Sequence, residues 1–363
     1  MRILQVLSDT NRGGAGVYLE NYVQNRAKDM EVVVALPLGA AMAPRLRRAG
    51  AHVVECDLKG DASFERRDIG VLMTCIETFR PDIVHTHGSL SGRLAARRIG
   101  RCKTVYTKHT LSPPRLGLRG AAAAALDNKL TDAVIAVSRA GYDNLLEQGF
   151  EREKIHLIYN GITGLSPATE GGRGEARERL GLAGGDFVVA CVARIEPVKN
   201  HEQLLIAVAL LHGEGLPVKL LLAGGGTQAG ALERRASELQ LGDTVRFLGE
   251  LEDVRPVYAA ADLFALTSES ENLPLTLLEA MSAGLPALLT DVGGMKEAAV
   301  EGETAIFVQV SDIGRTASTI RRLMARPGEL ARLGGAAQRR FQERFTADSF
   351  ARQTELLYRK LVD

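Results

Sequence analysis

Short apolar runs alternate with longer amphipathic stretches along almost the whole chain. The first series of apolar runs lies at residues 3–7, 32–36, 53–56, 83–85, 105–107 and 134–137. A second series lies at residues 187–193, 219–223, 245–248, 263–266, 287–289 and 305–308. Apolar runs of this length between helix-patterned stretches are typical of parallel strands joined by helices. The sequence therefore predicts an α/β fold with two parallel sheets.

The chain is long enough for two domains, and a break in the pattern marks their junction. It has 363 residues, of which 45% are hydrophobic, which is more than one compact core usually contains. Residues 163–174 follow the turn pair Asn160 and Gly161, are rich in Gly, Ser and Pro, and lack periodicity. Residues 327–362 have the pattern of two amphipathic helices. We therefore expect a first domain at 1–162, a linker at 163–184, a second domain at 185–344 and a C-terminal helix at 345–363.

Charge, hydropathy and cysteine spacing argue against several classes of protein. The net charge is +1 and no long segment is uniformly apolar, so we expect neither nucleic-acid binding nor a membrane-spanning helix. The first residues resemble a strand and lack the apolar core of a secretory signal, so we expect a cytoplasmic protein. The cysteines have no Cys-x-x-Cys spacing, which favours reduced core residues over a zinc site or disulfides; they are Cys56, Cys75, Cys102 and Cys191.

Two carboxylates flank a predicted helix start. Glu271 and Glu279 are eight positions apart, and Pro274 between them suits the first position of a helix, where its missing N–H is not needed. The amides of Leu275 and Thr276 then point outward with the positive end of the helix dipole, which favours an anion. A Glu near a helix N-terminus also has a purely structural use. The loops after other strands must decide between these two interpretations.

Two further loops carry residues suited to phosphate. Ligands of parallel α/β sheets bind at the carboxyl ends of the strands. Gly13 and Gly14 follow the first strand, where they allow close approach of backbone to a ligand, although simple turn glycines give the same pattern. Arg194 and Lys199 follow the first strand of the second domain. Unless both are merely solvated, a diphosphate fits between the planar fork of Arg and the point charge of Lys.

The full series of motifs resembles that of the retaining glycosyltransferases of family 4, which have the GT-B fold. In the second half the resemblance rests on Arg194 with Lys199, Gly224-Gly-Gly226, Phe247-Leu-Gly249, Ala261-Asp262, Ser268-x-x-Glu271-x-x-Pro274 and Glu279-Ala-Met-Ser-Ala-Gly284. In the first half it rests on Arg12-Gly-Gly14, His85-Thr-His87, Tyr106-Thr-Lys-His109, Val137-Ser138 and Tyr159-Asn160-Gly161. The resemblance implies two Rossmann-like domains facing each other across a cleft. It makes the first the acceptor side and the second the donor-binding side, with the C-terminal helix crossing back to the first.

The same resemblance implies an activity. It is the transfer of a hexose-type sugar, with retention of configuration, from a nucleotide diphosphate donor to a hydroxyl acceptor. UDP is the expected carrier, and cell-surface glycan, glycolipid or small-glycoside biosynthesis is the expected setting. The favoured family mechanism is a front-face reaction in which the donor phosphate takes the proton of the acceptor. No cofactor or metal is expected, and the chain has no Asp-x-Asp motif for a nucleotide-bound cation.

Individual roles also follow from the resemblance. Arg194 and Lys199 are expected to bind the pyrophosphate, so alanine at either position should reduce turnover far more than stability. Glu271 is expected to hold sugar hydroxyls and Glu279 the ribose, while His109 contacts the sugar near the reacting carbon. The remaining donor-binding residues are expected to be Gly13, Gly14, Gly225, Leu248, Asn272, Leu273, Pro274, Leu275 and Thr276.

Three points leave alternatives open. Many family members have Gly where this chain has Asn272, a change that would narrow the sugar pocket. His85 and His87 follow a strand, where they either contact the acceptor, support His109 or have a structural role. A non-hydrolysing nucleotide-sugar epimerase shares the architecture, although the motifs fit a transferase better. The other alternative is a noncatalytic nucleotide-sugar-binding protein.

A basic stretch lies in the first domain. Residues 83–126 contain no Asp or Glu, and their cations are Arg93, Arg97, Arg98, Arg101, Lys103, Lys108, Arg115 and Arg119. With the apolar residues at 111–118, the 93–119 stretch suits peripheral contact with an anionic membrane or a phosphate-bearing acceptor. A solvated helix face, balanced by acidic groups elsewhere, explains the same pattern.

Overall fold

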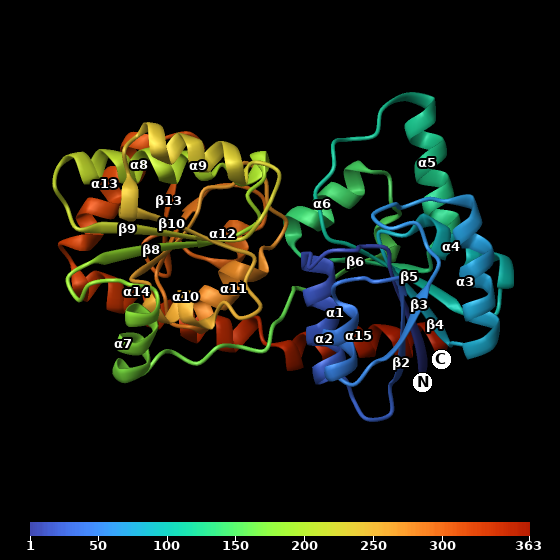
Figure 1. Cartoon of the computed structure of the whole chain (residues 1–363). Helices are drawn as coiled ribbons and strands as arrows, with labels where there is room; N and C mark the ends of the chain where they lie inside the picture. The colour runs from blue at the N-terminus through green and yellow to red at the C-terminus, as the bar shows by residue number, and fades with distance from the viewer. The chain divides into compact units, whose positions relative to one another are not determined.

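The chain forms two compact units in the computed structural model, which describes residues 1–363. The first unit contains Met1–Thr163 and Phe345–Asp363, and the second contains Gly164–Arg344. Each unit has one parallel sheet with helices on both faces (Figure 1). The predicted α/β class with two parallel sheets is therefore confirmed.

The sheet of the first unit has the strand order β3-β2-β1-β4-β5-β6-β7, with every neighbouring pair parallel. Its strands are β1 (Arg2–Leu7), β2 (Glu31–Pro37), β3 (His52–Cys56), β4 (Ile83–His87), β5 (Lys103–Lys108), β6 (Ala133–Ala136) and β7 (Ile155–Leu157). The apolar runs predicted all of these except β7, whose three residues are too few to form a pattern. Strands β1, β2, β4 and β6 are buried over most of their length, as expected for a sheet covered on both faces, whereas the edge strand β3 is mostly only partly buried.

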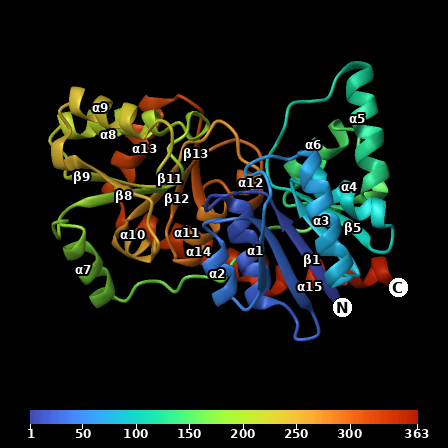
Figure 2. The same cartoon turned by 45° about the vertical axis from the view of Figure 1, so that its right-hand side comes forward.

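The helices of the first unit lie on opposite faces of its sheet. They are α1 (Gly14–Asn25), α2 (Ala43–Arg48), α3 (Arg66–Phe79), α4 (Leu90–Ile99), α5 (Gly117–Leu130), α6 (Arg139–Glu147), the short η1 (Arg152–Lys154) and α15 (Ala347–Val362). Right-handed crossovers place α1 and α2 on one face and α3 to α6 on the other (Figure 2). Ser89 and Ser138 begin α4 and α6 by accepting hydrogen bonds from backbone amides.

The C-terminal helix α15 belongs to the first unit and packs against α1. The Ile162 amide donates to the Phe345 carbonyl at 3.0 Å, and the Ala347 amide donates to the Ile162 carbonyl at 2.9 Å. The hydroxyl of Thr346 accepts a hydrogen bond from the Ser349 amide and so begins the helix. The predicted return of the C-terminal helix to the N-terminal domain is confirmed.

The sheet of the second unit is parallel with the order β10-β9-β8-β11-β12-β13. Its strands are β8 (Phe187–Val192), β9 (Val218–Ala223), β10 (Val245–Gly249), β11 (Leu263–Leu266), β12 (Ala287–Thr290) and β13 (Ala305–Val308). Its helices are α7 (Glu170–Arg179), η2 (Pro197–Lys199), α8 (His201–Gly213), α9 (Ala229–Glu238), η3 (Gly242–Thr244), α10 (Arg255–Ala260), α11 (Leu275–Ser282), α12 (Met295–Ala298), α13 (Ile313–Met324) and α14 (Pro327–Arg344). Helices α8, α9 and α13 cover one face, and α10, α11 and α14 cover the other (Figure 1).

Part of the expected linker is folded. Helix α7 lies within residues 163–184 and packs against α10. Arg173 and Arg177 of α7 both pair with Asp262, at 2.6 Å and 3.5 Å. The Gly- and Ser-rich composition concealed this helix, because its stability comes from ion pairs with the body of the unit rather than from an apolar stripe.

No helix of the structure combines the length and apolarity that a bilayer crossing requires. All four cysteines are free thiols. Cys56 and Cys191 are buried, whereas Cys75 and Cys102 are partly buried. These positions agree with the predicted reduced core residues.

Candidate functional site

A cation and a carboxylate meet where the strand order of the second sheet reverses. Lys199 follows β8 and Glu271 follows β11, and these two strands are neighbours. The Nζ of Lys199 lies 2.5 Å from Oε1 of Glu271. The Ser268 hydroxyl donates to the same oxygen at 2.7 Å. The Lys199 side chain is 18% exposed and that of Glu271 is 8% exposed, so this ion pair is largely shielded from water.

Backbone contacts hold the two loops of this ion pair together. The Glu269 amide donates to the Val198 carbonyl at 2.8 Å. The Thr267 hydroxyl donates to the Asn200 carbonyl at 2.9 Å. The Thr290 hydroxyl donates to the Ser268 carbonyl at 2.6 Å. The positions of Lys199 and Glu271 are therefore fixed by the fold and do not depend on the ion pair alone.

Glu279 lies one turn inside α11 and is held by a tyrosine. The Tyr258 hydroxyl donates to Oε2 of Glu279 at 2.7 Å and also lies 3.2 Å from the Thr276 carbonyl oxygen. Pro274 is the residue that precedes the helix, one position earlier than predicted, and Leu275 is its first residue. Leu275 and Thr276 are partly exposed, and their amides belong to the first turn, which has no earlier carbonyls to bind. An anion can use these donors.

The glycine loop after β9 packs on the loop that carries the predicted phosphate cations. Gly224 and Gly226 have φ angles of +144° and +152°. A β-carbon at position 224 would lie 2.1 Å from the Ala193 carbonyl oxygen, and one at position 226 would lie 2.4 Å from that of Ile195. Only glycine fits both positions. The Ile195 amide donates to the Gly225 carbonyl at 2.7 Å, which joins the two loops.

The loop after β10 is attached to the same edge. The Gly224 amide donates to the Gly249 carbonyl at 2.8 Å, so the loop that contains Gly225 lies beside the end of β10, which contains Leu248. Arg194 is exposed and forms no ion pair, in contrast to Lys199. Asn272 and Leu273 are buried beside Glu271. All residues predicted to bind the donor in this half of the chain therefore come from the carboxyl ends of β8 to β11.

In the first unit, the predicted glycines begin α1. Gly13 is the residue that precedes the helix, and Gly14 is its first residue. A β-carbon at position 14 would meet no atom within 4 Å, so this helix start is open. The preceding loop is braced by Asp61, whose amide donates to the Ser8 carbonyl at 2.8 Å and whose carboxylate accepts from the Thr10 amide at 3.0 Å.

His109 is supported by His87. The Nε2 of His109 lies 2.9 Å from Nδ1 of His87, and the two rings are stacked. His85 and His87 are fully buried, so of the open alternatives for this pair the structure favours support of His109 over contact with an acceptor. Burial lowers the pKa of His109 to about 4 and that of His85 to about 3, and it lowers the pKa of His87 well below its usual value. All three rings are therefore neutral near pH 7.

The basic 93–119 stretch does not form one surface patch. Arg93 is buried, and its Nη1 lies 2.6 Å from Asp127, which also pairs with Arg115 at 2.6 Å. The end of α4 and the start of β5, at the amino end of the strand, carry the exposed cations Arg97, Arg98, Arg101 and Lys103. Leu116, Leu118 and Arg119 lie past the carboxyl end of β5, where α5 begins, and are exposed. The fold thus separates cations that are neighbours in the sequence.

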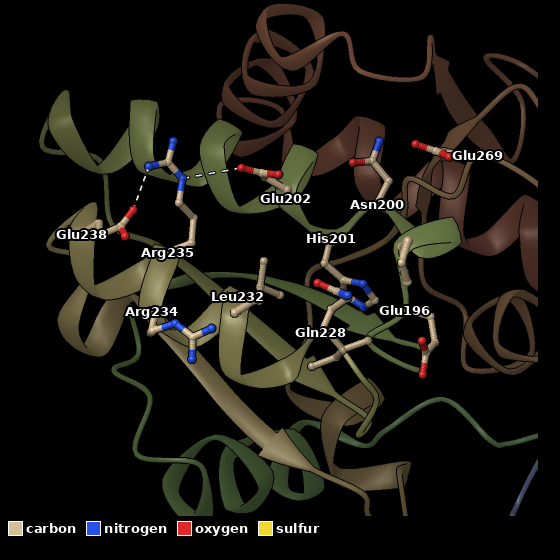
Figure 3. Close-up of a pocket in the computed structure, with 13 residues that line it drawn as sticks. Glu196, Asn200, His201, Glu202, Gln228, Leu232, Arg234, Arg235, Glu238 and Glu269 are labelled. Carbon is tan, nitrogen blue, oxygen red and sulfur yellow. Dashed lines mark hydrogen bonds and ion pairs between the residues drawn. The ribbon is translucent and has the colours of Figure 1, made fainter.

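A cavity of about 500 Å³ lies between α8 and α9, next to the predicted donor site (Figure 3). It is lined by Glu196, His201 and Gln228 among others, but by neither Lys199 nor Glu271. His201 is buried and neither ring nitrogen has a hydrogen-bond partner. Burial and the nearby Lys199 lower its pKa to about 4, so it is neutral. None of the predicted donor residues lines this cavity.

Sequence reasoning missed three residues of these sites. Tyr258 holds Glu279, whereas Gln5 and Tyr358 contact the buried histidines. None carries a local signal, because each contacts a partner distant in sequence. Ser268 was visible as the first residue of the motif that contains Glu271.

The fold and site define a two-unit α/β protein whose second sheet carries cations, carboxylates and the start of α11 along the carboxyl ends of its strands. Residues 172–340 match the pattern of glycosyl transferases group 1, and residues 12–163 match that of glycosyltransferase family 4. The chain therefore belongs to the family 4 glycosyltransferases, as the motifs predicted.

Known proteins agree with this assignment. D-inositol 3-phosphate glycosyltransferase of Mycolicibacterium smegmatis is 32% identical over 289 residues, which are 74% of this chain but 65% of that protein. Glycosyltransferase EpsD of Bacillus subtilis is 29% identical over 77% of this chain and 78% of its own length. The structure of Anabaena Alr3699/HepE in complex with UDP-glucose superposes with a TM-score of 0.85 at 24% identity, covering 98% of this chain and 99% of that one. This last similarity shows a shared fold, which is GT-B.

Proposed function

We propose that this protein is a retaining, metal-independent glycosyltransferase that moves a hexose-type sugar from a UDP-sugar to the hydroxyl of an acceptor. The observation that carries the proposal is the Lys199–Glu271 ion pair, beside the start of α11 and one helix turn from Glu279. This edge offers a cation and backbone donors for phosphate, and two carboxylates for hydroxyl groups. Family membership supports the same activity.

The donor diphosphate is proposed to lie between Arg194, Lys199 and the amides of Leu275 and Thr276. Negative charge grows on the diphosphate as it leaves. Fixed cations and a helix N-terminus stabilise that charge without having to reorganise. Because Lys199 is preorganised by Glu271, it needs little further ordering when the donor binds.

The two carboxylates are proposed to bind hydroxyls of different parts of the donor. Glu271, with buried Asn272, Leu273 and Pro274 beside it, receives the sugar. Glu279, oriented by Tyr258, receives the ribose. The base is proposed to lie against the backbone of Gly225 and Leu248. In this arrangement the carboxylates bind hydroxyl groups of the donor, and no protein nucleophile is required.

Donor contact is also proposed for Gly13, Gly14 and His109 of the first unit, which we assign to the acceptor side. A neutral His109 suits a transition state with oxocarbenium character, because an imidazolium beside the developing positive charge would repel it. The proton of the acceptor hydroxyl is proposed to pass to the donor phosphate in a front-face reaction.

The choice of UDP and of acceptor class is supported by the relatives. Alr3699/HepE was crystallised with UDP, with UDP and glucose, and with UDP-glucose. The names of other relatives include a D-inositol 3-phosphate glycosyltransferase and EpsD. We propose that the acceptor belongs to cell-surface glycan, glycolipid or small-glycoside synthesis.

A thermal-shift screen of nucleotides tests the donor, because a ligand that binds only the folded state raises the melting temperature. We expect UDP to raise it more than ADP or GDP, with and without EDTA. Incubation of the best UDP-sugar with an acceptor panel should then release UDP and form an α- or β-glycoside of unchanged anomeric configuration. No UDP-dependent shift, or an epimerised sugar nucleotide formed without acceptor, would refute the proposal.

We further propose a cytoplasmic protein with peripheral contact to an anionic membrane through Leu116, Leu118 and Arg119. Leu116 is 83% exposed and Leu118 is 91% exposed. Exposed apolar side chains beside a cation suit a lipid interface. The chain is expected to sediment with vesicles that contain anionic lipid, and Leu118→Ser should weaken this more than Leu210→Ser, which replaces a half-exposed leucine on α8 of the second unit. Equal sedimentation with neutral vesicles counts against the contact.

A further inference from the structure

Three polar residues of the first sheet face the C-terminal helix. Gln5 on β1 is paired in register with His85 on β4, and His87 lies two positions further along the same strand. Side chains two positions apart point to the same face of a sheet. All three are buried, as is Tyr358 of α15. Buried polar groups require hydrogen bonds, so their connections can be followed from atom to atom.

These residues form one continuous chain of hydrogen bonds that begins at His109. The His109 Nε2 lies 2.9 Å from His87 Nδ1, and the His87 Nε2 lies 2.9 Å from Gln5 Oε1. The Gln5 Nε2 donates to the Tyr358 hydroxyl at 3.2 Å. That hydroxyl lies 2.5 Å from Nδ1 of His85. The Nε2 of His85 lies 2.7 Å from the Thr107 hydroxyl.

The amide of Gln5 gives this chain a direction. Its oxygen can only accept, so the hydrogen of His87 is on Nε2. A neutral imidazole carries one hydrogen, so the Nδ1 of His87 is an acceptor and the hydrogen of His109 is also on Nε2. At the other end of Gln5, its Nε2 donates a hydrogen bond to the hydroxyl oxygen of Tyr358. The tyrosine hydrogen then goes to Nδ1 of His85, and His85 donates from Nε2 to Thr107.

We propose that Gln5 and Tyr358 are positioning residues that fix His109 in its Nε2–H form, which leaves Nδ1 as a bare acceptor. The role of His109 at the sugar rests on the proposed function, but its tautomer does not. A bare Nδ1 can accept a hydrogen bond from a sugar hydroxyl, and it adds no positive charge near the reacting carbon. The C-terminal helix therefore supplies a residue that sets the chemistry of the site through two intermediaries.

Tyr358→Phe removes the acceptor of the Gln5 amide and the donor to His85. The amide then has no fixed orientation, and the tautomers of His87 and His109 are no longer determined. Tyr22→Phe is the matched control, because Tyr22 is also buried at the α1–α15 interface but its hydroxyl has no hydrogen-bond partner. Ring-nitrogen NMR of protein labelled with ¹⁵N-histidine distinguishes the two tautomers of each ring. Signals are assigned with His85→Asn and His109→Asn.

We expect the Nε2–H form for all three rings in the natural protein and in Tyr22→Phe, and two forms of His109 in Tyr358→Phe. Two equally populated forms would lower kcat about twofold, since only one is competent. An Nδ1–H form of His109 in the natural protein overturns the proposal even if Tyr358→Phe does not fold. An unchanged tautomer in folded Tyr358→Phe overturns it as well, and shows a structural role only. If no sugar donor or acceptor supports transfer, the histidine spectra are still expected to show these tautomers. That result would count against the proposed function and not against the proposed tautomer.

Discussion

Replacement of Lys199 by methionine tests the centre of the proposed donor site. Methionine keeps most of the length of the side chain and removes the charge, which leaves Glu271 with the hydrogen bond from Ser268. Disrupting a fully buried ion pair costs about 3–5 kcal/mol, whereas an exposed pair contributes up to about 1 kcal/mol. The side chains are 18% and 8% exposed. We therefore expect the free energy of unfolding of the second unit to fall by about 2 kcal/mol.

The same substitution should weaken binding of UDP. A hydrogen bond to a charged group contributes about 1.5–3 kcal/mol, so the loss of one corresponds to a roughly 10-fold to 150-fold higher Kd. Arg194→Met is the matched control, because Arg194 is exposed and forms no ion pair. It should weaken UDP binding by a similar factor but change stability by less than about 0.5 kcal/mol. The sequence alone predicts that substitution of either residue acts mainly on turnover. The ion pair seen in the structure adds a decrease in the free energy of unfolding for the substitution of Lys199 only.

Binding is measured by titration calorimetry, and stability by hydrogen exchange of the β8 and β11 amides. Exchange is needed because a chain of two units does not unfold in one step. A double-mutant cycle with Glu271→Gln should give a coupling energy of about 1–3 kcal/mol. If Lys199→Met is as stable as the natural protein, or binds UDP equally well, the ion pair is not the organising contact of the site.

Three further predictions concern other contacts. Tyr258→Phe should raise the Kd for UDP about fivefold by releasing Glu279, which corresponds to a loss of about 1 kcal/mol of binding free energy. The Kd for 2′-deoxy-UDP should rise less. If calorimetry shows an equal rise in Kd for both ligands, Glu279 does not bind the ribose. Gly226→Ala should lower the melting temperature, because the strained backbone costs about 1–3 kcal/mol, whereas Gly230→Ala in α9 should raise it; a harmless change at 226 would show that the loop adapts. The free energy of unfolding should fall as the pH drops below 6.5, because the pKa of His85 is about 3 in the folded protein and the unfolded chain therefore takes up the proton first. The expected slope is about 1.4 kcal/mol per pH unit for each such proton. Urea titrations that give the same free energy of unfolding from pH 6.5 to pH 5 would exclude this effect.

Local pattern was sufficient for most of the fold. Twelve of the strands were visible as apolar runs, because strands buried on both faces need continuous apolar sequence. The missed strand, β7, has three residues. Helix α7 was also missed, because it is held by ion pairs of Arg173 and Arg177 with Asp262 rather than by an apolar face. Contacts of that kind depend on where another segment lies.

The candidate site was predictable to the extent that it is local. Pro274 and the spacing of Glu271 and Glu279 indicated the start of α11 to within one residue. The adjacency of Lys199 and Glu271, which are 72 positions apart, could be expected only from the rule that ligand loops meet where strand order reverses. The roles of the individual residues in binding remain predictions.

Sequence patterns alone were enough to predict the fold class, the glycosyltransferase family and the residue types around the proposed donor site. These properties follow from short-range patterns and from motifs whose spacing is fixed along the chain. The tertiary structure decided that Arg93 and Arg115 pair with Asp127 and do not face solvent together, and that Tyr358 contacts His85 across 273 positions. Such pairings arise because distant strands and helices pack side by side, and burial then requires each polar group to find the partner placed next to it.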